Sequence, residues 1–71
     1  MSTSVRAHIT GTVWKIEVAI GDAVTEGQTL VILESMKMEM PVEAPSAGQV
    51  SAILTKEGAA VEEGAVLIEL A

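Results

Sequence analysis

An internal repeat with an offset of 37 positions dominates the sequence. Shifting the chain by this offset aligns residues 5–34 with residues 42–71 without a gap. The matched identical residues are Val5/Val42, Ala7/Ala44, Gly11/Gly48, Val13/Val50, Ile16/Ile53, Gly21/Gly58, Ala23/Ala60, Val24/Val61, Glu26/Glu63, Gly27/Gly64, Leu30/Leu67 and Leu33/Leu70. A copy of about 30 residues cannot bury its apolar face alone. We therefore expect the two copies to pack on each other about a pseudo-twofold axis, as one domain over residues 1–71.

The glycines divide both copies in the same way. All six belong to the matched pairs, and their intervals suit short strands joined by tight turns rather than helices. Turns that need positive φ are expected at Ile20-Gly21-Asp22 and Glu26-Gly27-Gln28. Strands are predicted at about 4–7, 12–18, 29–34, 38–43, 49–55 and 65–70, with short extended pieces near 23–24 and 60–61.

Two strands are predicted to carry a β-bulge. Val13 and Ile16 are three residues apart, as are Val50 and Ile53, so a regular strand would place each pair on opposite faces. A bulge at residues 14–15 and another at 51–52 would return both members to the core. With no helix to protect the strand edges, the two halves are expected to close into an all-β sandwich or flattened barrel.

Composition excludes several classes of function. The net charge of −6 and an aromatic content of 1% argue against nucleic-acid binding, which uses basic side chains and stacking aromatics. No cysteine is present for disulfides, thiolate catalysis or zinc binding. The start lacks a signal-like apolar run and no stretch approaches about 18 apolar residues, so we expect no membrane association and a cytoplasmic location.

The segment between the two copies is unique. Residues 35–41 read Ser-Met-Lys-Met-Glu-Met-Pro and predict a hairpin that turns near Met36-Lys37. Two-residue hairpin turns usually contain Asn, Asp or Gly because the favoured types need positive φ. Met and Lys depart from this rule, and such departures tend to mark strained or functional sites. The alternative is an unstrained type I or bulged turn, with methionines covering apolar surface.

The motif Glu34-Ser35-Met36-Lys37-Met38-Glu39 resembles the attachment motif of biotinyl domains, which belong to the biotin/lipoyl attachment family. The resemblance extends over nearly the whole chain, through the Gly-Asp and Glu-Gly turns and residues 44–48. Ser35 stands where the family usually has Ala, and His8 stands where the second half has Pro45. The resemblance implies a flattened barrel of two four-stranded antiparallel sheets, a barrel-sandwich hybrid. Because the sequence has no insertion for the protruding thumb of some members, we expect the minimal form of the domain, without a linker.

The same resemblance implies the function of a biotin carboxyl carrier. Lys37 would be biotinylated covalently by a biotin protein ligase, and the swinging arm would then carry carboxyl groups between biotin carboxylase and carboxyltransferase sites. Met36 and Met38, beside Ser35, would be recognised by the partners. Glu34 and Glu39 would orient or screen the lysine, although charged residues on a hairpin are often only solvated.

Two other functions use the same barrel. A lipoyl carrier would present its lysine at the same position, but lipoyl domains usually carry Asp-Lys-Ala instead of Met-Lys-Met. An unmodified barrel could serve in assembly, although the intact motif argues against it. An enzyme is not expected, because the chain has one histidine, no cysteine and no cluster with metal-ligand spacing.

Overall fold

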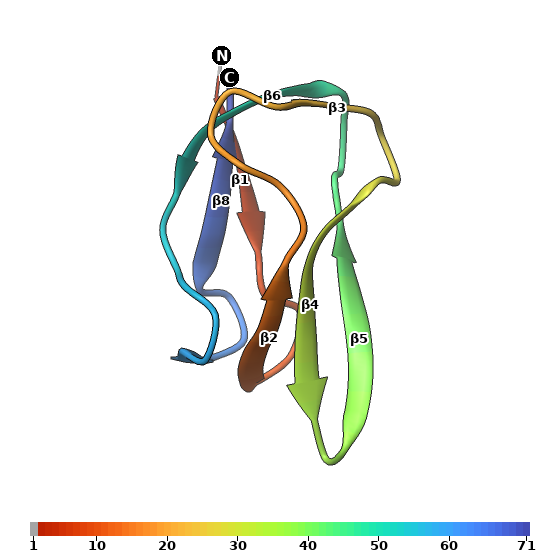
Figure 1. Ribbon diagram of the computed structural model, residues 1–71, viewed down its shortest axis with the longest axis vertical. Helices are drawn as coiled ribbons and strands as arrows, with labels where there is room; N and C mark the ends of the chain where they lie inside the picture. The colour runs from red at the N-terminus through yellow and green to blue at the C-terminus, as the bar shows by residue number, and fades with distance from the viewer. Residues whose placement is uncertain (1) are drawn as a thin grey trace.

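Residues 2–71 are described by a computed structural model, and they form strands and turns throughout (Figure 1). The strands are β1 (Thr3–Arg6), β2 (Gly11–Ile16), β3 (Ala23–Val24), β4 (Thr29–Ser35), β5 (Met38–Glu43), β6 (Gly48–Ile53), β7 (Ala60–Val61) and β8 (Val66–Leu70). Each predicted strand is present, with ends that differ by at most two residues. The part of the chain seen here contains no helix long and apolar enough to span a membrane.

Two four-stranded antiparallel sheets make up the fold, which confirms the predicted class. Their strand orders are β1-β8-β6-β3 and β5-β4-β2-β7. The offset of 37 residues converts the first order into the second, so the two sheets are related by the repeat. Each sheet takes two strands from each copy, and neither copy therefore contains a complete sheet.

The core lies between the two sheets and is entirely apolar. Its buried members are Val5, Ala7, Val13, Val24, Leu30, Val31, Leu33, Val42, Ala44, Val50, Leu67, Ile68 and Leu70. Ile16 and Ile53 pack against it as partly buried side chains. Burial of the Val, Leu and Ile side chains stabilises a fold by about 1.5–3 kcal/mol each relative to exposure. No polar side chain of residues 2–71 is buried among them.

Both predicted bulges are present. The register between β2 and β4 shifts between Val13 and Lys15, and the register between β6 and β8 shifts between Val50 and Ala52. The extra residue in each strand reverses the alternation of faces. Val13 is therefore buried while Ile16 also reaches the core.

The glycine turns adopt the backbone conformation expected of them. Gly21 and Gly58 have φ of 97° and 88°. The Gly21 amide donates a hydrogen bond of 2.8 Å to the Val50 carbonyl, and the Gly58 amide donates one of 2.7 Å to the Val13 carbonyl. Matched glycines thus fasten the turn of one copy to a strand of the other.

The molecule is elongated, with extents of 33 × 18 × 17 Å. The β4–β5 hairpin projects from one end, and both chain termini lie at the opposite end (Figure 1). The repeat thus produces two similar poles, and only one of them carries the hairpin formed by the unique segment.

Candidate functional site

The unique segment forms a two-residue turn. Ser35 of β4 pairs with Met38 of β5, so Met36 and Lys37 are the only residues in the loop. Their φ angles are 53° and 64°. Positive φ at both positions defines a type I′ turn, whose twist matches that of a hairpin. The turn lies where it was predicted, and the alternative of an unstrained type I turn is wrong.

The turn stores backbone strain. Residues other than glycine rarely adopt the left-handed backbone region. Each one that does so lowers the stability of the fold by on the order of 1 kcal/mol or more. Asn or Gly would avoid most of this cost, yet Met36 and Lys37 occupy both positions. The strain is tolerated because β4 and β5 are paired from the Ser35–Met38 pair down to their bases, which holds both ends of the turn.

Lys37 and its neighbours extend into solvent. Lys37 is exposed, while Met36 and Met38 are 92% and 56% exposed. The one ion pair among residues 2–71 joins Lys15 to Glu17 at 3.7 Å. Lys37 is thus an exposed amine between two methionines in the sequence, and no ion pair in the described part of the chain ties it to a carboxylate.

The hairpin has two different faces. Leu33 and Val42 point into the core, so Ser35, Met38 and Met40 share their side of the strands because side chains alternate. Glu34 and Glu39 lie on the other side, directly opposite one another, and both are exposed. The six predicted residues, 34–39, therefore surround one turn, with the carboxylates on its outer face.

A buried base holds the hairpin in place. β4 lies between β5 and β2 in its sheet, and its Leu30, Val31 and Leu33 are fully buried. Close packing of these side chains leaves little freedom for the strand that leads to the turn. The site is therefore an exposed lysine side chain carried on a strand whose base is closely packed.

The close approach of Gly11 to the base of the hairpin was not predicted from the sequence. A Cβ built on Gly11 would lie 2.6 Å from the Glu34 carbonyl oxygen and 3.4 Å from the Ser35 Cβ. The first strand residue of β2 thus packs against the root of the hairpin. The only signal in the sequence was the pairing of Gly11 with Gly48 at positions where no tight turn was predicted.

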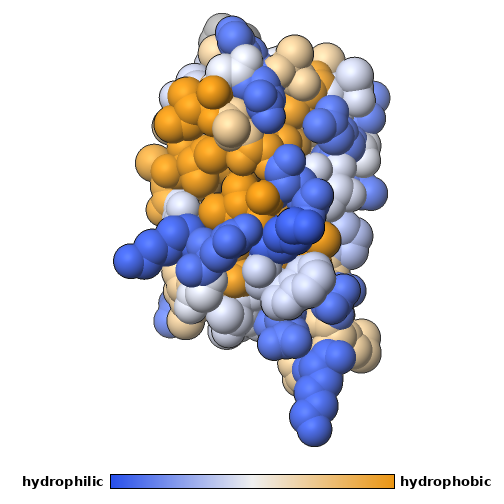
Figure 2. Space-filling model, viewed as in Figure 1, coloured by the Kyte–Doolittle hydropathy of each residue, from blue (hydrophilic) through white to orange (hydrophobic). Residues whose placement is uncertain are grey.

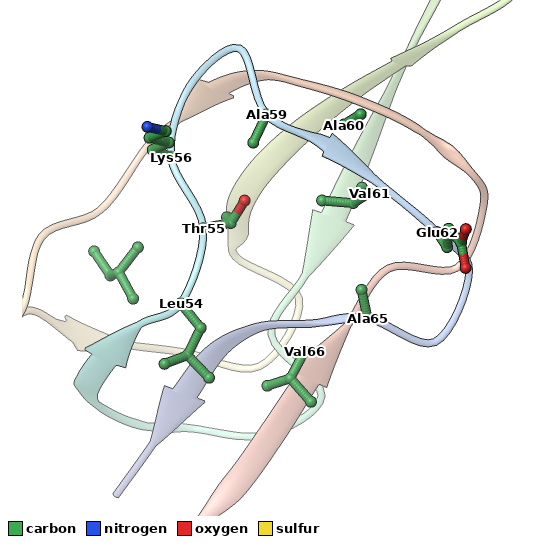
Figure 3. Close-up of a pocket in the computed structure, with 10 residues that line it drawn as sticks. Leu54, Thr55, Lys56, Ala59, Ala60, Val61, Glu62, Ala65 and Val66 are labelled. Atoms are coloured by element: carbon green, nitrogen blue, oxygen red, sulfur yellow. The ribbon is translucent and has the colours of Figure 1, made fainter.

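A concavity of about 690 Å³ lies away from the hairpin, beside the loop between β6 and β7. Figure 3 shows Leu54, Thr55 and Lys56 along one side of it and Val61 and Val66 along another. None of its lining residues belongs to β4 or β5. Residues 2–71 also bring together no group of three His, Cys, Asp or Glu side chains that could hold a metal ion.

The hairpin holds the Lys37 side chain away from the body of the barrel. Figure 2 shows a narrow protrusion at the end of the molecule where Figure 1 places the β4–β5 turn. An amine at such a tip can enter the active site of another protein while the barrel stays outside. A covalently attached group requires a reachable nucleophile, and the exposed side chain of Lys37 is reachable.

Comparison with known proteins agrees with this geometry. Residues 1–70 match the family of biotin and lipoyl attachment domains described as "Biotin-requiring enzyme". A biotin/lipoyl attachment protein of Bacillus subtilis is 46% identical over 67 residues, which cover 94% of this chain and 92% of that protein. A biotin carboxyl carrier protein of Streptococcus mutans is 48% identical over 65 residues, or 92% of this chain and 50% of that protein.

A solved structure shares the fold. The crystal structure of Kluyveromyces lactis urea carboxylase superposes on 100% of this chain with a TM-score of 0.94 and 37% sequence identity, and the match covers 6% of that protein. The likeness thus concerns one small domain of a large carboxylase. From the match over nearly its whole length, the chain belongs to the biotin/lipoyl attachment domain family.

Proposed function

We propose that this chain is a biotin carboxyl carrier and that Lys37 is the residue to which biotin is attached. The observation that carries the proposal is the exposed Lys37 at the tip of the projecting hairpin, between Met36 and Met38, in a member of this family. Names of relatives support the cofactor and the role, since they include a biotin carboxyl carrier protein and a biotinylated protein. The role is that of a carrier and not of a catalyst.

Attachment would proceed at the Nζ atom of Lys37. A biotin protein ligase presents an activated carboxyl group, the neutral amine attacks its carbonyl carbon, and an amide forms as the activating group leaves and the amine loses its proton. Only the neutral form of an amine is nucleophilic, so a protonated amine must first give up its proton. The ligase must therefore accept the proton, and the carrier contributes the placement of Nζ.

The residues beside Lys37 would serve recognition. Met36 and Met38 offer flexible, polarizable side chains that adapt to apolar pockets of partner proteins. Ser35 lies at the root of the turn on the core side, and Glu34 and Glu39 present two carboxylates on the outer face. Their place in recognition is tested by substitution of each residue in turn.

When attached, biotin would supply carboxyl transport between two chemically different active sites. The long side chain of Lys37 and its rigid base would let the arm reach a biotin carboxylase and then a carboxyltransferase, raising its effective concentration at each. Relatives that include an acyl-coenzyme A carboxylase subunit and pyruvate carboxylases support carboxylase partners. The compartment we propose is the cytoplasm, because the chain has no cysteine for the disulfides of small secreted domains.

Mass spectrometry after incubation with a biotin protein ligase, biotin and ATP tests the proposal. We expect one biotinyl increment on Lys37 and none on Lys37→Arg, whose guanidinium is not a nucleophile at neutral pH. Native electrophoresis should show a shift toward the anode, because loss of the ammonium changes the formal charge from −6 to −7. Labelling of Lys15 or Lys56 instead, or an increment of lipoyl mass from a lipoyl ligase alone, would contradict it.

A further inference from the structure

Gly11 lies at the point where the neighbouring strand stops supporting the hairpin. The last pair between β2 and β4 joins Thr12 to Glu34, and β2 begins one residue earlier at Gly11. Beyond this pair the segment from Ser35 to Met38 projects past the end of β2 (Figure 1). Gly11 is therefore the last strand residue beside the root of the acceptor turn.

The backbone of β4 lies so close to Gly11 that no residue with a Cβ fits at this position without a shift. A Cβ on Gly11 would stand 2.6 Å from the Glu34 carbonyl oxygen, which is backbone and cannot rotate away. Regaining ordinary van der Waals separation would require a displacement of roughly 0.5 to 1 Å. Either β2 or the hairpin would have to move.

Past Glu34 the hairpin has fewer supports than β2 does. β2 is held on its other side by β7, where Gly11 pairs with Val61 and Thr12 pairs with Ala60. The Val13 amide also donates a hydrogen bond of 2.8 Å to the Ala59 carbonyl. Past Glu34 the hairpin has only its own partner strand, so a displacement there would be transmitted to the tip.

We propose that Gly11 is a positioning residue for the acceptor hairpin: its missing side chain lets the Glu34–Ser35 backbone settle against β2 and thereby sets where Lys37 stands relative to the barrel. The inference rests on the proposed function, because the position of Lys37 matters only to a partner that reads the turn and the barrel together. A misplacement of about 1 Å can cost an enzyme up to about a hundredfold in rate.

The repeat provides a matched control at the opposite pole. Gly48 is the counterpart of Gly11, and a Cβ on it would stand 2.9 Å from the Ala71 carbonyl oxygen and 3.4 Å from the Leu70 Cβ. The two glycines thus make the same kind of contact with the ends of β4 and β8. β6, which begins at Gly48, lies at the end of the molecule away from the hairpin (Figure 1).

The test compares Gly11→Ala with Gly48→Ala as purified full-length chains. Initial rates with a biotin protein ligase, biotin and ATP are measured against acceptor concentration, well below both melting temperatures and with a stabilising osmolyte in all samples. We expect kcat/KM to fall about tenfold or more for Gly11→Ala and to stay within about twofold of the parent for Gly48→Ala. Amide NMR signals of residues 36–38 should shift in the first variant only.

A chemical control distinguishes a change in where Lys37 stands from a change in how exposed its amine is. Acylation by a biotin succinimidyl ester requires only an exposed amine, so the rate at Lys37 should be equal in the parent and both variants. Equal ligase rates for the two variants, whether both normal or both reduced, would overturn the inference, as would a Gly11→Ala chain that does not fold. Failure of the proposed function would appear differently, as a parent chain that the ligase leaves unmodified at Lys37.

Discussion

Glu34 and Glu39 lie directly opposite one another across the β4–β5 hairpin, on its outer face and one pair removed from the turn. Both side chains are exposed. Like charges at directly opposed positions of an antiparallel pair repel and lower stability by about 0.2–1 kcal/mol. The hairpin that presents Lys37 therefore carries an unfavourable charge pair as well as a strained turn.

Replacing one of these carboxylates should stabilise the protein. For Glu39→Gln we expect the free energy of unfolding to rise by a few tenths of a kcal/mol, up to about 1 kcal/mol, because the repulsion is removed. Urea denaturation at low salt measures the gain, and added salt should reduce it by screening. Glu62→Gln, in the exposed turn before β8, serves as the control, and an equal gain there would show that only net charge matters.

Relieving the strain of the turn should separate stability from function. Asn adopts positive φ more readily than Met, so Met36→Asn should raise the free energy of unfolding by about 1 kcal/mol. For a domain of this size that corresponds to a melting temperature about 4–8 °C higher. Met38→Asn, at a strand position that disfavours Asn, should give no such gain.

The same Met36→Asn variant should be a poorer acceptor, because it removes the most exposed apolar side chain that the tip offers to a partner. Biotinylation rates with a fixed amount of ligase measure this loss. A variant that is more stable and modified as fast as the parent would show that Met36 has no part in recognition.

The glycine turns should depend on backbone conformation alone. A Cβ at Gly21 or Gly58 would meet no atom within 4 Å, yet both residues have positive φ. We therefore expect Gly21→Ala and Gly58→Ala to destabilise the protein by similar amounts, about 1–2 kcal/mol each. Thermal melting measures the loss, and Gly21→Asn should lose less than Gly21→Ala. Unchanged melting in the alanine variants would be inconsistent with the observed φ angles.

Separated halves should not fold alone. Residues 1–36 contain β1 to β4 and residues 37–71 contain β5 to β8, but each sheet needs strands from both. Each peptide should lack strand signal by circular dichroism, and an equimolar mixture should recover it because the complementary strands then meet. Analytical ultracentrifugation identifies the species, and a half that folds as a monomer would contradict the interleaved topology.

Much of the fold could be predicted because each local feature of the backbone appears at matched positions in both copies of the repeat. The pairing of Val13 with Val50 and of Ile16 with Ile53 indicated the bulges, and Gly21 with Gly58 indicated the turns that need positive φ. These are local requirements of backbone geometry, repeated in both copies. The interleaving of strands was not apparent in the same way, because pairing partners such as β1 and β8 lie at opposite ends of the chain.

The sequence by itself determined the β class, the strand positions, the unique hairpin and the lysine at its turn, because these depend on side-chain alternation and on the φ preferences of residues close together in the chain. Only the tertiary structure decided that β2 begins beside the hairpin root, that the Glu34 carbonyl leaves no room there for a Cβ on Gly11, and that the two carboxylates lie opposite each other on the outer face. Those relationships arise when strands distant in sequence share a sheet, where register and close packing, and not local preference, set which atoms meet.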